Sequence, residues 1–207
     1  ELVSDADHRP PPLSLLLREM GSFAWMRARA TFAPSVVTGM CGDGHKVIVI
    51  PGFMASDRTT GRLRRTLDRA GFASSGWGLG RNRGIRADVL QRLDARIATV
   101  AGEDSVTIIG WSLGGLIARE YAKFAPERVT RVITLGTPFS VDLRANNAWR
   151  AYELIAGHKV DEPPINAIPH EKPPVPTTAF WSRQDGVVAP ASARGAEGEA
   201  DERIELR

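Results

Sequence analysis

Short apolar runs alternate with amphipathic segments along most of the chain. Runs of apolar, often β-branched residues at 46–50, 105–109, 129–135 and 177–181 predict buried strands, and 203–206 alternates like a last strand. Apolar residues at helical spacing predict helices over roughly 59–70, across 90–100, and from 113 up to Pro126. Strands that alternate with helices predict an α/β fold, in which a mostly parallel central sheet carries helices on both faces.

Two segments stand outside this alternation. Residues 1–38 form a polar lead-in followed by an amphipathic helix, in which Leu13, Leu16, Leu17, Met20 and Phe23 share one face. The pattern favours a helix packed on the domain over a helix on a membrane surface. Residues 140–174 contain a short helical pattern and a proline-rich stretch, and we expect them to form a lid or cap. The alternative for this insertion is a disordered loop. We expect residues 1–207 to form one domain.

Composition sets limits on function. The chain has 207 residues with a net charge of +3, dispersed along its length, which argues against a nucleic-acid partner. No apolar run is long enough to span a bilayer, although contact with a membrane surface stays open. The lone Cys41 excludes an intramolecular disulfide. No signal peptide is visible, so the compartment stays unassigned, with the cytoplasm favoured.

The segment Gly110-Trp111-Ser112-Leu113-Gly114 fits the G-x-S-x-G pattern. It follows a predicted buried strand and opens a predicted helix, which is the context that this sharp turn requires. Its glycines let strand and helix approach each other, and its serine stands near a helix N-terminus, where a developing anion is favoured. Pro51-Gly52 and Gly136-Thr137 also follow predicted strands, at the sheet edge where such folds bind ligands.

With these motifs the chain resembles the α/β-hydrolase superfamily, in its serine lipase and esterase branch. The resemblance covers residues 46–207. It is carried by the serine motif, by Val49–Phe53, by Thr134–Phe139 and by Ser182–Val188, in the family's order. It implies a hydrolase of small-molecule or lipid carboxylic esters that forms an acyl-enzyme and uses no cofactor.

The resemblance also implies roles for single residues. Ser112 would be the nucleophile, and the backbone N–H groups of Leu113 and Phe53 would form the oxyanion hole. Met54 and Trp111 would line the substrate pocket. Asp185 would be the acid of the triad, with Asp142 as its rival, because some family members carry the acid after the preceding strand.

The base of the triad is the difficulty. In this family a histidine follows the acid, yet none follows Asp185 here. His8 and His45 lie before the first strand, and His158 and His170 lie in the predicted lid, where surface positions are expected. We therefore expect the chain to lack its C-terminal part, which would carry the histidine, and to be inactive by itself.

Other functions stay open. A thioesterase or an acyltransferase would use the same machinery, and a non-catalytic binding protein can share the fold. The glycine-rich segment 76–84 fits no phosphate-binding pattern, so a structural connection is expected there. No cluster of residues has the spacing of metal ligands.

Overall fold

The computed structural model describes residues 41–140 and 146–206. These residues form a six-stranded, all-parallel sheet in the order β2-β1-β3-β4-β5-β6. The strands are β1 (Lys46–Ile50), β2 (Ala73–Gly76), β3 (Val106–Trp111), β4 (Val129–Leu135), β5 (Thr177–Trp181) and β6 (Glu202–Glu205). The α/β class predicted from the sequence is confirmed, and every described strand pair is parallel.

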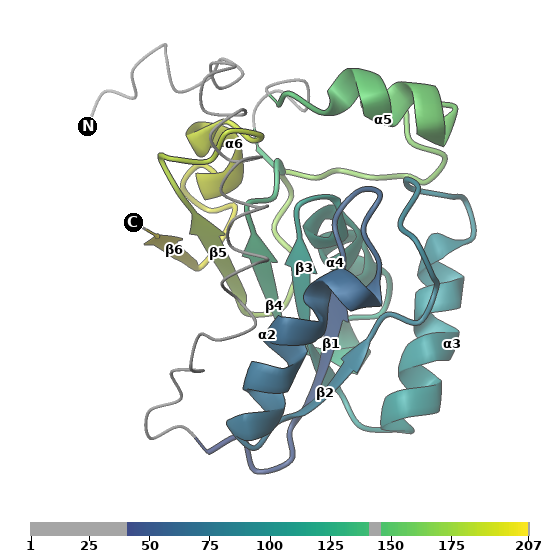
Figure 1. Ribbon diagram of the computed structural model, residues 1–207, viewed down its shortest axis with the longest axis vertical. Coiled ribbons are helices and arrows are strands. Elements are labelled where there is room, and N and C mark those ends of the chain that lie inside the picture. Colours follow the sequence, from purple (N-terminus) through teal and green to yellow (C-terminus); the bar gives the residue numbers. More distant parts are fainter. Residues whose placement is uncertain (1–40, 141–145, 207) are drawn as a thin grey trace.

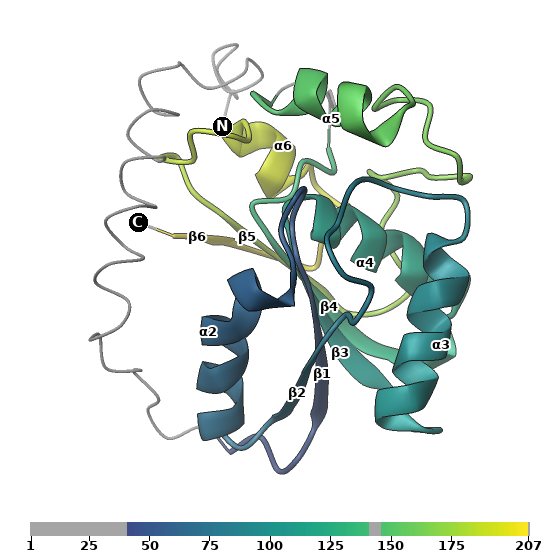
Figure 2. The same ribbon diagram turned by 45° about the vertical axis from the view of Figure 1, so that its right-hand side comes forward.

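Helices cover both faces of the sheet (Figure 1). They are α2 (Asp57–Arg69), α3 (Val89–Ala101), α4 (Leu113–Phe124), α5 (Trp149–Ala156) and α6 (Pro190–Arg194), with a short 3₁₀ turn η2 (Pro126–Arg128). Figure 2 shows α2 on one face and α3 with α4 on the other, while α5 lies beyond the carboxyl ends of the strands. No helix in the described ranges is both long and apolar enough to cross a membrane.

The larger core lies between the sheet and the pair α3 and α4. The interior strand β1 reads Lys-Val-Ile-Val-Ile, and its four apolar residues are buried because both faces of the sheet are covered. Helix α4 is buried from Leu113 to Ala122. A smaller cluster on the other face holds Val47, Val49 and Ile109 against Leu63 and Leu67 of α2. The two ends of the serine motif, β3 and α4, therefore lie in the buried part of the fold.

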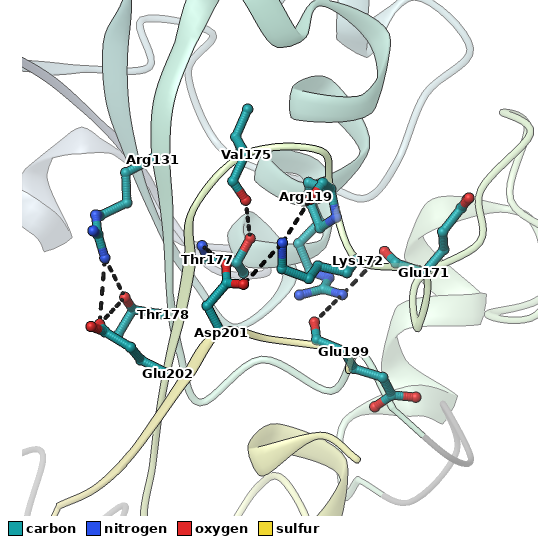
Figure 3. A network of polar contacts seen from close by, with 11 residues as sticks. Arg119, Arg131, Glu171, Lys172, Val175, Thr177, Thr178, Glu199, Asp201 and Glu202 are labelled. Carbon is teal, nitrogen blue, oxygen red and sulfur yellow. Dashed lines mark hydrogen bonds and ion pairs between the residues drawn. The ribbon is translucent and has the colours of Figure 1, made fainter. Parts of the chain in front are cut away.

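A buried arginine ties α4 to two later parts of the chain. Arg119 is fully buried; its Nε donates to Pro169 O at 3.0 Å, and its Nη2 donates to Glu171 O and Glu199 O at 3.2 and 3.0 Å. Burial lowers its pKa to about 10, which leaves it charged at neutral pH. Nearby, Lys172 pairs with Asp201 at 3.1 Å (Figure 3). These bonds fix the proline-rich segment before β5 and the loop before β6.

Two predicted regions fall largely or partly outside the described residues. The lead-in and helix of residues 1–38 lie outside them, as does Asp142. Of the predicted lid, residues 146–174 are described, and they contain α5 where the helical pattern around Trp149 and Tyr152 predicted a helix. The division of residues 1–207 into domains stays a prediction.

Candidate active site

The serine turn has a strained backbone. Ser112 stands between β3 and α4 with φ 51° and ψ −121°, in a region that side-chain-bearing residues seldom occupy. Its N–H donates to Leu135 O at 2.8 Å, and its carbonyl accepts from Gly115 N at 2.9 Å and from Thr137 Oγ1 at 3.0 Å. The end of β4, the loop that follows it and the first turn of α4 therefore hold this turn in place.

The glycines around Ser112 are required by close packing. A Cβ at Gly110 would overlap the backbone of Gly114 and Gly115, and a Cβ at Gly115 would overlap Thr137 Oγ1. A Cβ at Gly114 would lie 2.8 Å from Pro51 O and closer still to the carbonyl of Ile50. Helix α4 can therefore approach β1 and β3 only because these side chains are absent.

Two backbone N–H groups beside Ser112 have no hydrogen-bond acceptor among the residues that the structure describes. One belongs to Leu113, the first residue of α4, and the other to Phe53, in the loop after β1. This loop passes close to the serine, since a Cβ at Gly52 would lie 3.3 Å from Ser112 Cβ. The N–H of Met54, by contrast, donates to Asn82 O at 2.6 Å. Of the N–H groups of Phe53 and Met54 in this loop, that of Phe53 is therefore the one available to an oxyanion.

A small pocket of about 50 Å³ opens beside Ser112. It lies at the carboxyl ends of the strands and collects side chains from the loop after β1, from α4, from α5 and from the loop after β5. Its lining is mostly apolar, and it consists of Phe53, Ile85, Ser112, Leu113, Leu116, Pro138, Asn146, Ala148, Trp149, Tyr152, Val160, Val187 and Val188. The pocket therefore brings Ser112, Leu113 and Phe53 together with α5.

Met54 and Trp111 are not among the residues that line this pocket. Met54 has φ 58°, and its N–H is directed at Asn82. The ring of Trp111, at the end of β3, lies against the loop after β1, with Cδ2 3.3 Å from the Cβ position of Gly52. Met54 therefore belongs to the loop after β1 and Trp111 lies against that loop, and neither lines this pocket.

Asp185 lies in the loop after β5, at the same edge of the sheet as Ser112. Its Oδ1 accepts from the N–H groups of Val187 and Val188 at 2.8 and 2.9 Å, and both valines line the pocket. Its Oδ2 lies 3.0 Å from the Cβ position of Gly136 and accepts no hydrogen bond from a described residue. Burial raises the pKa of this carboxyl, while the two N–H donors oppose that rise. Oδ2 is thus available to an external N–H donor.

None of the described histidines contacts Asp185. His45 lies at the other end of the sheet, where Nε2 is 2.9 Å from Thr107 Oγ1. His158 contacts Tyr152 Oη at 3.3 Å and Ile85 O at 2.9 Å through Nε2. The carbonyl of His170 accepts from Arg119. Within residues 41–140 and 146–206 there is also no group of three potential metal-ligating side chains.

Sequence reasoning missed the residues that support the site from outside the motifs. Asn82 is fully buried and bonds to the loop after β1, although it stands among arginines in a glycine-rich segment. The only hint in the sequence is its place in that segment, for which no phosphate site could be argued. Asn146 and Leu116 also line the pocket. Leu116 could have been found, because it lies on the helix that Ser112 opens.

Comparison with known proteins agrees with this geometry. A family model described as "alpha/beta hydrolase fold" matches residues 36–157. The pimeloyl-[acyl-carrier protein] methyl ester esterase of Photobacterium profundum is 31% identical over 126 residues, which cover 57% of this chain and 48% of that protein. The chain thus spans about half the length of this curated relative.

Two solved structures share the fold. A monoacylglycerol lipase of Paleococcus ferrophilus superposes with a TM-score of 0.58 at 16% identity, covering 81% of this chain and 86% of that one. A lipase-esterase related protein of Clostridium acetobutylicum also gives 0.58, at 13% identity, covering 81% of this chain and 88% of that one. At these identities the likeness is one of fold.

Proposed function

The chain belongs to the α/β hydrolase family, and on that premise we propose that it is a serine hydrolase of carboxylic esters. The observation that carries the proposal is the position of Ser112. It stands on a strained turn at the N-terminus of α4, in an apolar pocket, beside the N–H groups of Phe53 and Leu113, which have no acceptor in the described parts of the chain. A nucleophile and two donors for a developing oxyanion are the parts that acyl transfer needs.

The reaction proceeds in two halves. Ser112 Oγ attacks the ester carbonyl carbon, its proton passes to the base, and the carbonyl oxygen takes the negative charge. The N–H groups of Phe53 and Leu113 stabilise that charge. The intermediate then expels the alcohol, which takes the proton from the base and leaves an acyl-enzyme on Ser112. Water, deprotonated by the base, attacks the acyl carbon; the bond to Ser112 Oγ then breaks, the serine takes the proton back from the base, and the acid is released.

Asp185 orients the base and stabilises it when it is protonated. Its Oδ1 is occupied by two backbone N–H groups, so Oδ2 is the atom that accepts the imidazole N–H. The base that this proposal needs is a histidine, and none of His45, His158 and His170 contacts Asp185. Because no described histidine contacts Asp185, we expect residues 1–207 by themselves to have negligible esterase activity.

The substrate is an ester whose acyl part is apolar. The pocket beside Ser112 is lined mainly by apolar side chains. The curated relative is named for a methyl ester carried on an acyl-carrier protein, and a carboxylic ester is the bond shared with this proposal. An acyltransferase or thioesterase would share the first half-reaction, and the acceptor or the leaving group would then differ.

A fluorophosphonate probe tests the proposal in the protein at its full natural length. We expect the probe to label Ser112, and we expect Ser112→Ala to abolish both labelling and hydrolysis of a p-nitrophenyl ester. Equal labelling of the Ala variant at another residue would contradict the assignment. Folded protein that binds an ester and neither hydrolyses nor transfers its acyl group would favour the binding protein.

A further inference from the structure

The loop after β1 is held by a second loop that no step above uses. Four hydrogen bonds join residues 51–55 to Arg81 and Asn82. Asn82 N donates to Ala55 O at 2.8 Å, and Met54 N donates to Asn82 O at 2.6 Å. The Asn82 side chain donates through Nδ2 to Pro51 O at 2.8 Å, and Arg81 Nη1 donates to Met54 O at 3.1 Å. The backbone and the side chain of Asn82 therefore form three hydrogen bonds with this loop.

Asn82 is suited to this task because its amide is satisfied on both sides. The side chain is fully buried, and its Oδ1 accepts from Gly84 N at 3.3 Å while Nδ2 serves the carbonyl of Pro51. A buried polar group keeps one orientation when both its donor and its acceptor are engaged. The amide thus fixes the point at which the chain leaves β1.

The same contacts decide which N–H of the loop faces the nucleophile. Met54 adopts φ 58°, an unfavourable conformation for a residue with a side chain, and the bond from its N–H to Asn82 O helps to hold it there. Met54 N–H is bonded to Asn82, so Phe53 N–H, which has no acceptor in the described residues, is the donor of this loop that is available to an oxyanion. An oxyanion donor is effective only if its direction is set before the charge develops.

We infer that Asn82 is the positioning residue of the oxyanion hole. It touches neither substrate nor Ser112, and it acts by holding residues 51–55 so that Phe53 N–H points to the developing oxyanion. The inference rests on the proposed function. It also assigns a role to the glycine-rich segment 76–84, whose turn delivers Asn82 into the interior beside β1.

The test compares Asn82→Ala with a matched control in the full-length protein. Thr177→Val also removes one fully buried hydrogen bond to a backbone carbonyl, that of Val175 at 2.9 Å, at the amino end of β5 (Figure 3). We expect Asn82→Ala to lower kcat by about 10-fold to 100-fold, less than the loss of about 10²-fold to 10³-fold that follows removal of a donor itself. KM should stay within about twofold, because ground-state binding in the pocket is untouched.

A trifluoromethyl ketone supplies a readout that a general loss of stability does not move. Ser112 adds to it to form a tetrahedral oxyanion, so its affinity should fall in Asn82→Ala in parallel with kcat/KM. Thr177→Val should leave kcat and inhibitor affinity unchanged even if its melting temperature falls as far. An unchanged kcat in folded Asn82→Ala, with the wild type active, would overturn this inference alone.

Two further outcomes are decisive. If Asn82→Ala does not fold, Asn82→Ser is measured in its place, and failure of both to fold would overturn the inference by showing a purely structural role. A wild-type protein without Ser112-dependent acyl transfer would overturn both the proposed function and this inference.

Discussion

At the scale of single residues, the candidate site combines a strained serine with hydrogen-bonding groups that have no partner in the described parts of the chain. Ser112 is held at φ 51° and the N–H groups of Phe53 and Leu113 have no acceptor in the described parts of the chain. Asp185 has one oxygen engaged and one available. Such unmet hydrogen bonding costs stability in a folded protein and is typical of catalytic sites.

Asp185→Asn separates the two candidates for the acid. In the full-length protein we expect it to lower kcat by several orders of magnitude, about 10⁴-fold in the serine-protease template, because the amide favours the wrong tautomer of the histidine. Asp142→Asn serves as the comparison and should cost far less. Initial rates with a p-nitrophenyl ester measure both. The opposite ranking would move the acid to Asp142.

The same substitution is expected to change how the free energy of unfolding depends on pH. Since burial raises the pKa of Asp185, the folded state binds this proton more tightly than the unfolded state does. The free energy of unfolding therefore falls as pH rises from the unfolded pKa of about 3.9 through the higher folded pKa. In a chain of residues 1–207, where no described histidine contacts this carboxyl, Asp185→Asn removes that penalty and should be more stable than the wild type at pH 7.5, with the gap closing toward pH 4. Urea midpoints at the two pH values check this, and a gap that is independent of pH would contradict it.

At the scale of elements, two helical glycines have opposite roles. Gly61 in α2 has room for a methyl group, since its nearest side-chain neighbour is the flexible end of Arg65 at 3.5 Å, whereas Gly114 in α4 faces the carbonyls of Ile50 and Pro51. We expect Gly61→Ala to raise the free energy of unfolding by roughly 0.5–1 kcal/mol and Gly114→Ala to lower it by roughly 2–3 kcal/mol. Denaturant titrations measure both, and equal effects would show that helix propensity outweighs packing.

The position of helix α5 leads us to expect that it influences which acyl chain lengths the pocket accepts. Trp149 lines the pocket, while Leu154 on the same helix has 85% of its surface exposed. We expect Trp149→Ala in the full-length protein to shift kcat/KM by about tenfold toward longer p-nitrophenyl esters relative to the acetate, because an enlarged apolar pocket accepts further methylenes. Leu154→Ala should leave the ratio unchanged. If Trp149→Ala alters only stability, with selectivity intact, α5 is not a lid over the acyl site.

The sequence predicted best the strands that are buried on both faces. β1, β4 and β5 have the bounds expected from their apolar runs, because strands buried on both faces leave a continuous signal. The strand β2, Ala-Ser-Ser-Gly, went unpredicted since an edge strand buries little. Asn82 escaped for a related reason: its role depends on a partner 31 positions away, and no local pattern reports such a contact.

At the scale of the whole molecule, the candidate site is assembled from distant parts of the chain. Ser112, Phe53 and Val188 line one pocket although 135 positions separate the last two. The fold achieves this because the carboxyl ends of all its parallel strands meet at one edge. The sheet order therefore decides where chemistry can occur, and the loops decide which chemistry it is.

The buried Arg119 has a consequence for the order in which the chain is made. Its acceptors lie 50, 52 and 80 positions further along the chain, at Pro169, Glu171 and Glu199. During synthesis these carbonyls emerge from the ribosome long after α4, so the guanidinium stays hydrated until then. Contacts of such long range close late in folding. The helix that opens at Ser112 therefore completes its buried contacts only when the chain around Pro169 and Glu199 has docked on it.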